Sequence, residues 1–141
     1  MHRLDQATSG LLLLALDPLT HRELSRAFAE RRVRKTCLAW VEGCPQARVG
    51  WIAHPLARIG TRPPRYGRVP VEEGGKAALT RWRLLKRGTT ASATNSLLLL
   101  APHTGRSHQL RVHLALLGHP HTGAPLRLRC PSHWRCSFWP P

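Results

Sequence analysis

The chain has 141 residues, a length typical of one domain with a single hydrophobic core. Its 22 lysine and arginine residues outnumber seven acidic residues, and the formal net charge of +15 predicts a polyanionic partner, with nucleic acid favoured over a membrane surface. The most apolar run, Leu11 to Leu16, is far shorter than the roughly 20 residues of a membrane-spanning helix, so we expect a soluble, cytoplasmic protein.

The first expected elements are a strand and a helix. Leu11 to Leu16 is short and continuously apolar, as in a buried strand. Asp17 followed by Pro18 is typical of an N-cap and a first helical residue, and predicts a helix that runs to about Arg31. One face of this helix is expected to carry three apolar residues: Leu24, Ala27 and Phe28.

Four further segments have the pattern of strands. Residues 35–43, KTCLAWVEG, alternate between apolar and polar side chains, and residues 50–59 predict a strand that is broken at Pro55. Two more strands fit residues 77–85 and 96–101, with a polar loop between them.

A basic segment and a second helix complete the pattern. Residues 60–76, GTRPPRYGRVPVEEGGK, are rich in proline, glycine and arginine and predict a mobile basic arm. A helix is expected from about Ser107 to Leu117, with Gly118 as its stop. Several strands with two helices and no strict βαβ alternation predict an α+β domain with a mixed, largely antiparallel sheet and flanking helices.

Two motifs carry the chemistry. HRLDQATSG occupies residues 2–10 and GRSHQLRVHLALLGHP occupies residues 105–120. Taken alone, the second is typical of a solvated basic helix. Together the two resemble the principal signatures of the RluA family of RNA pseudouridine synthases, and the likeness covers His2 to about Pro120.

The resemblance implies a pseudouridine synthase-like fold and an enzyme that isomerises uridine in ribosomal or transfer RNA stem-loops as a monomer, with no cofactor and no metal. Asp5 matches the family's nucleophilic aspartate. Five other carboxylates are weaker candidates, because Asp17 is expected at a helix cap, Glu23 and Glu30 on an exposed helix side, and Glu72 and Glu73 in the arm. Arg111 matches the arginine that pairs with this aspartate, and Arg3 matches the one that enters the RNA stack. Cys37 stands where the family has a tyrosine that packs on the uracil.

Other basic side chains are expected to bind RNA without chemistry. Arg62 and Arg65 lie in the arm, and Arg106 and His108 stand at the start of the second helix, where phosphate contact is the favoured interpretation. For His113 an ordinary structural hydrogen bond is favoured.

The resemblance ends before the chain does. We expect residues 1–126 to form a partial catalytic domain that is incomplete at both ends, followed by a divergent, disordered tail over residues 127–141. Two alternatives stay open. The chain could be a non-catalytic RNA-binding remnant, or it could bind zinc through His121 and residues of the tail (Cys130, His133 and Cys136), although incidental cysteine and histidine are favoured there.

Overall fold

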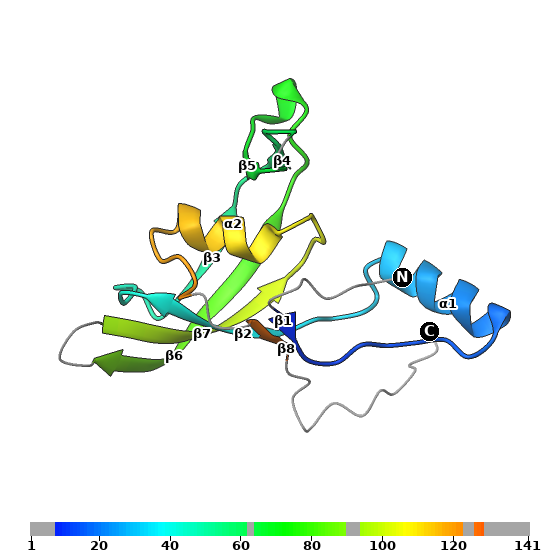
Figure 1. Ribbon diagram of the computed structural model, residues 1–141, viewed down its shortest axis with the longest axis horizontal. Helices are drawn as coiled ribbons and strands as arrows, with labels where there is room; N and C mark the ends of the chain where they lie inside the picture. The colour runs from blue at the N-terminus through cyan, green and yellow to red at the C-terminus, as the bar shows by residue number, and fades with distance from the viewer. Residues whose placement is uncertain (1–7, 62–63, 90–93, 123–125, 129–141) are drawn as a thin grey trace.

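A computed structural model describes residues 8–61, 64–89, 94–122 and 126–128. Its main feature is a six-stranded sheet with the order β1-β8-β2-β7-β6-β3, and a separate two-stranded sheet pairs β4 with β5 (Figure 1). The strands are β1 (Thr8–Ser9), β2 (Cys37–Glu42), β3 (Val49–Ala53), β4 (Leu56–Arg58), β5 (Tyr66–Arg68), β6 (Leu79–Thr89), β7 (Thr94–Pro102) and β8 (Leu126–Leu128). The helices are α1 (Pro18–Ala29), α2 (Gln109–Leu116) and the short 3-10 turn η1 (Val71–Glu73).

The large sheet is mixed but mostly antiparallel. Strands β1 and β8 pair in parallel, whereas the other described pairs, β8–β2, β2–β7, β7–β6 and β6–β3, are antiparallel. The predicted α+β class is therefore confirmed. Strand β8 includes Arg127 and Leu128, the first two residues of the expected tail, and the rest of that tail lies outside the described residues.

The hydrophobic core lies between α2 and one face of the sheet. Alternate residues of β2 and β7 point to this face, as a strand's two-residue period requires, and Leu114 of α2 packs on them with no exposed surface. Figure 1 shows α2 lying across these strands, while α1 stands apart from the sheet. The core residues are Cys37, Ala39, Val41, Ile52, Trp82, Leu98, Leu100 and Leu114.

Helix α1 begins as its sequence predicts and ends close to the predicted residue. Asp17 is the N-cap, and its Oδ1 accepts a hydrogen bond from the Thr20 amide at 2.8 Å. At the other end the amide of Arg32 donates to the Ala27 carbonyl oxygen, and Arg31 takes a left-handed φ of 58°. This is a Schellman-type ending in which arginine occupies the position usually given to glycine. No helix among the described residues is long and apolar enough to span a membrane.

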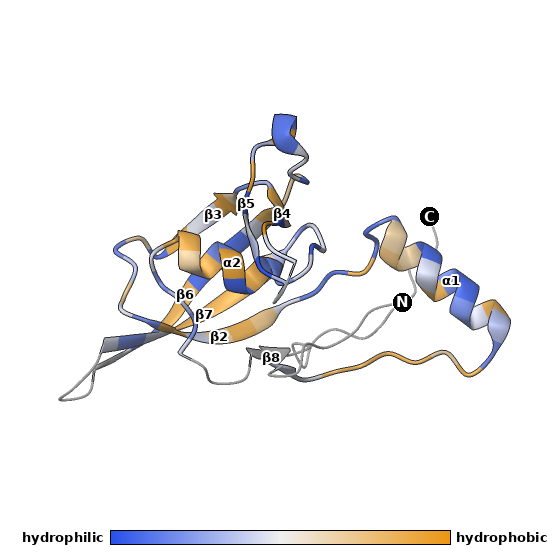
Figure 2. Cartoon of the chain, turned by 45° about the horizontal axis from the view of Figure 1, so that its top comes forward, coloured by the Kyte–Doolittle hydropathy of each residue, from blue (hydrophilic) through white to orange (hydrophobic). Residues whose placement is uncertain are grey.

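The strand predicted over Leu11 to Leu16 is wrong. These residues are not part of a strand in the structure, and their leucines lie exposed, from 44% at Leu13 to 98% at Leu16. Figure 2 shows them as an apolar trace that leads to α1, away from the core. Apolar composition favours burial, but a strand forms only where a second backbone satisfies its N–H and C=O groups.

The mobile basic arm is also corrected, because the described part of residues 60–76 is a folded hairpin. Residues 66–68 pair in antiparallel register with β4, and the Val69 amide donates to the Pro55 carbonyl oxygen. Pro55 separates β3 from β4, and Leu56 anchors the hairpin with 3% exposure. The prolines and glycines thus separate short strands in this segment. Arg62 lies outside the described residues.

Gly75 closes this hairpin through a close backbone approach. A Cβ at Gly75 would overlap the carbonyl oxygen of Val69, whereas one at Gly74 would meet nothing within 4 Å. We expect Gly75→Ala to destabilise the hairpin by about 1–3 kcal/mol, as overpacking does. Faster amide hydrogen exchange at Leu56 and Lys76, which pair across its base, would report this loss.

Gly74→Ala is the comparison variant. It introduces only the strain of a left-handed φ of +90°, which costs about 1 kcal/mol. Equal exchange rates in the two variants would contradict the steric explanation.

Candidate active site

The loop that leads into α2 is held by a buried side-chain network centred on Gln109. Its Oε1 accepts hydrogen bonds from the Thr104 hydroxyl at 2.8 Å and from the Arg106 amide at 3.0 Å. Its Nε2 donates to the Leu79 carbonyl oxygen at 3.1 Å and to the Thr80 hydroxyl at 3.0 Å. Gln109 therefore ties the GRSHQLR motif to the start of β6, and every polar atom of its amide is satisfied.

His113 extends this network one turn further along α2. It is fully buried, its Nε2 contacts the His54 carbonyl oxygen at 3.2 Å, and its Nδ1 contacts the Thr80 hydroxyl at 2.9 Å. Because a carbonyl oxygen can only accept, the proton sits on Nε2, and Nδ1 accepts from Thr80. The structural hydrogen bond predicted for His113 is confirmed, and neutral imidazole is the form that fits.

Burial lowers the pKa of His113 below its ordinary value of 6.5, although the bond to the His54 carbonyl opposes this shift. As the pH falls below about 6.5, His113 becomes protonated in the unfolded chain but stays neutral in the folded chain. The burial of neutral His113 therefore favours the folded state above about pH 6.5, and this stabilisation is lost as the pH falls below that value. We expect the free energy of unfolding to decrease between about pH 7 and pH 5.5, by at most about 1.4 kcal/mol for each unit of pH. Urea unfolding measured across this range tests it, and a pH-independent midpoint would contradict it.

Arg111 and His121 lie on the β2 side of α2. Desolvation lowers the pKa of His121, and the nearby positive charge of Arg111 lowers it further. His121 forms a backbone bridge with Val41 of β2, so Arg111 lies near that strand. Asp5 and Arg3 are outside the described residues; in the sequence, Asp5 precedes the first residue of β1 by three positions.

Cys37 begins β2 and is part of the core, with 4% of its surface exposed. Burial raises the pKa of its thiol to about 12, and the charge of Lys35 reduces that shift. At neutral pH the side chain is therefore a protonated thiol, which neither abstracts a proton nor offers a ring to a base. The resemblance places Cys37 in the catalytic site, at the position of the family's tyrosine, and this placement stays a prediction.

Lys35 is a cation that the sequence interpretation missed. A Cβ added at Gly105, in the GRSHQLR loop, would lie 3.6 Å from its Nζ, which is also 5.9 Å from the centre of the Phe28 ring. Lys35 precedes Cys37 by two residues, and residues two apart on an extended chain point to the same side. This two-residue spacing from Cys37 was the sequence signal that could have identified Lys35 as a candidate site residue.

A pocket between the β4–β5 hairpin and α2 brings two predicted RNA-binding residues together. Arg65 comes from the hairpin and His108 from the start of α2, and both line a space of about 400 Å³. The Tyr66 and His108 rings lie 5.2 Å apart at 55°. Tyr66, the single tyrosine of the chain, was not singled out by its sequence context.

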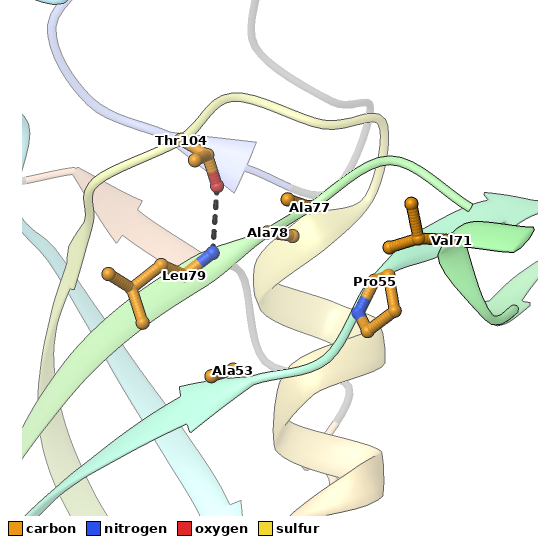
Figure 3. A pocket seen from close by; sticks show the side chains of 7 residues that line it. All are labelled: Ala53, Pro55, Val71, Ala77, Ala78, Leu79 and Thr104. Atoms are coloured by element: carbon orange, nitrogen blue, oxygen red, sulfur yellow. Dashed lines mark hydrogen bonds between the residues drawn. The ribbon is translucent and has the colours of Figure 1, made fainter. Parts of the chain in front are cut away.

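Arg106, another predicted RNA-binding residue, does not line this pocket. Its Nε donates to the Ala77 carbonyl oxygen at 3.1 Å, so its guanidinium group lies at the base of the hairpin. Ala77 also lines a second, apolar cavity of about 380 Å³. Figure 3 shows its walls of small apolar side chains and the bond from the Leu79 amide to the Thr104 hydroxyl at one side. The residues that line that cavity include none of the predicted site residues.

Metal ligands do not cluster in the part of the chain that the structure describes. The zinc alternative names Cys130, His133 and Cys136, which lie outside that part.

Comparison with known proteins identifies the family. Residues 1–116 match the family model of the RNA pseudouridylate synthases. The chain is 42% identical over 123 residues to the dual-specificity RNA pseudouridine synthase RluA of Escherichia coli K12 and 44% identical over 127 residues to an uncharacterised RNA pseudouridine synthase of Zymomonas mobilis. The chain belongs to the RluA family of RNA pseudouridine synthases. The resemblance drawn from the two motifs is therefore confirmed.

These matches cover 87% and 89% of the chain but 54% and 55% of the relatives, so the chain spans about half the length of the RluA-family proteins it matches. The fold agrees with solved structures as well. Human RNA pseudouridylate synthase domain containing 1 superposes with a TM-score of 0.81 at 34% identity, over 90% of this chain and 60% of that one.

Proposed function

We propose that this chain isomerises uridine to pseudouridine in structured ribosomal or transfer RNA, with Asp5 as the nucleophile. The observation that carries the proposal is the family match over residues 1–116, which contains both Asp5 and Arg111. The net charge of +15 fits an RNA substrate. We further propose that the chain acts as a monomer in the cytoplasm.

The chemistry needs one carboxylate and no redox partner. Asp5 forms a covalent bond to the nucleotide, the bond from uracil N1 to ribose C1′ breaks, and the uracil turns so that C5 bonds to C1′. The hydrogen leaves C5 as a proton, N1 gains a proton, and Asp5 is released as a carboxylate. Because substrate and product are isomers, electrons and atoms balance without a cofactor.

Arg111 gives this carboxylate its partner. A carboxylate that is withdrawn from water keeps its charge only if a nearby cation offsets the lost solvation. Arg111 is half-buried on α2, and its positive charge already lowers the pKa of His121. Arg3 would replace the stacking lost when the target nucleotide leaves the RNA stack.

A second candidate function is RNA binding without catalysis, and Cys37 favours it. Its buried thiol, with a pKa raised to about 12, occupies the position at which the family resemblance calls for a tyrosine. Nucleoside analysis of ribosomal and transfer RNA after incubation with the protein separates the two functions. New pseudouridine supports the enzyme, and saturable binding without it supports the second function.

The arginines of the basic segment, residues 60–76, should contribute to affinity through phosphate contacts. Replacing Arg62, Arg65 and Arg68 with alanine should flatten the logarithmic salt dependence of RNA affinity by up to about 0.7 for each lost contact with single-stranded RNA. Fluorescence anisotropy over a series of KCl concentrations measures this slope.

The control removes the same charge elsewhere, from exposed positions of α1 and its end (Arg22, Arg26 and Arg32). An identical slope for the two triple variants would show that the basic segment contributes only its net charge.

A further inference from the structure

We propose that the pocket between the β4–β5 hairpin and α2 binds an unpaired RNA base beside the target uridine. We call it the Tyr66 pocket; it is lined by Ile59, Pro64, Arg65, Tyr66, His108 and Val112. The proposal deepens the function proposed above, and as a statement about an RNA substrate it rests on that function.

The walls of the Tyr66 pocket suit a planar aromatic ligand. Ile59 and Val112 supply apolar surface, and Tyr66 and His108 supply two rings, neither of which is fully buried. Bases stack on such rings, and a guanidinium group such as that of Arg65 can hold the attached phosphate. Apolar walls, aromatic rings and one cation together match a nucleotide better than a bare anion, which would gain nothing from the apolar surface.

Two backbone features accompany this arrangement. A Cβ at Gly67 would lie 2.8 Å from Cδ1 of Ile59, at the end of its side chain, so Ile59 lies close over the hairpin backbone at this point. His108 is the N-cap of α2 with a left-handed φ of 53°, although its side chain makes no capping hydrogen bond. Such strain in a residue other than glycine costs about 1 kcal/mol or more and is often found at functional sites. Here it accompanies a ring placed against Tyr66.

The Tyr66 pocket is distinct from the proposed site of chemistry. Arg111 lies near His121 and β2, whereas Val112 lines the pocket on the hairpin side. Successive helical residues point about 100° apart, so one turn of α2 presents the two sites in different directions. A base in the pocket would be a neighbour of the target uridine, held while the target reaches Arg111 and Asp5.

The pocket lies where two parts of the fold already meet. The hairpin forms its own two-stranded sheet, and the Tyr66 ring meets the start of α2 at His108. A base stacked there would bridge the hairpin and α2. RNAs with an unpaired base at this position would therefore be selected over fully paired ones.

The single tyrosine of the chain provides the test, since one labelled residue gives one set of ring signals. We would label tyrosine with ¹³C in the Asp5→Asn variant, which binds RNA without turnover under the proposed function. The probes are an oligouridine of about ten nucleotides and a ribose–phosphate oligomer of equal length without bases, which span one single-strand binding site. The expected result is a saturable upfield shift of the Tyr66 ring signals with oligouridine and none with the abasic oligomer.

Equal shifts with both probes, or no shift at saturating oligouridine, would overturn the proposal. His108→Ala should reduce affinity for oligouridine about five-fold or more, the usual size of one stacking contact. Val49→Ala, at an exposed residue of β3 outside the pocket, is the matched control. Failure of the proposed function has a different readout. The wild-type chain would then form no pseudouridine, whether or not oligouridine shifts the Tyr66 ring signals.

Discussion

Replacing Asp5 with asparagine should abolish pseudouridine formation and leave RNA affinity nearly unchanged. The amide is close in size to the carboxylate but carries no negative charge, so it cannot form the covalent bond that starts the reaction. RNA affinity comes mainly from cations that contact phosphates, and this change removes none of them. Nucleoside analysis under single-turnover conditions measures the chemistry, and anisotropy measures the affinity.

The chain offers a matched control in Asp17, its other aspartate. Asp17→Asn makes the same chemical change at the N-cap of α1, where asparagine serves as well as aspartate. Activity should persist in this variant. Pseudouridine formed by Asp5→Asn at the wild-type rate would end the nucleophile assignment.

Gln109→Ala should produce the largest loss of stability among single changes outside the hydrophobic core. It removes four hydrogen bonds at once and leaves the Thr104 hydroxyl, the Arg106 amide and the Leu79 carbonyl oxygen without that partner. An unsatisfied buried polar group costs about 1–3 kcal/mol, and the Leu79 carbonyl oxygen and the Thr104 hydroxyl each keep one other hydrogen bond, so we expect a total loss of about 3 kcal/mol. Urea unfolding measures it.

Gln46→Ala, in an exposed loop, is the control and should change stability by less than about 0.5 kcal/mol. The Gln109 variant should also lose RNA affinity, because the network fixes the backbone of Arg106. A variant as stable as the control would mean that the network adds little to the native state.

Local patterns predicted most of the secondary structure. The Asp17–Pro18 signal, the alternation in residues 35–43 and the stop at Gly118 all describe interactions within a few residues, and these interactions formed as expected. Residues 94–102 form a longer strand than predicted, since pairing with β6 extends into the polar segment. Propensity alone does not encode such pairing.

The wrong predictions have one cause: a strand forms only by pairing with residues that are distant along the chain. The apolar run at Leu11 to Leu16 does not form a strand in the structure, whereas β5 pairs with β4 although its segment has a composition typical of loops. The same limit applies to the site. Arg65 and His108 were each expected to bind RNA, but their sequence contexts did not indicate that they share a pocket. Only folding brings the Tyr66 ring to 5.2 Å from the His108 ring.

The central claim is that this chain breaks the bond from N1 to C1′ and rebuilds it at C5, and release of tritium from RNA labelled at uracil C5 tests it most directly. Bond formation at C5 expels the hydrogen there, so each pseudouridine formed releases one tritium into water. Under single-turnover conditions with saturating protein, the wild-type chain should release tritium in an exponential phase, and Asp5→Asn should release none. Saturable RNA binding by the wild-type chain with no tritium released would contradict the proposal.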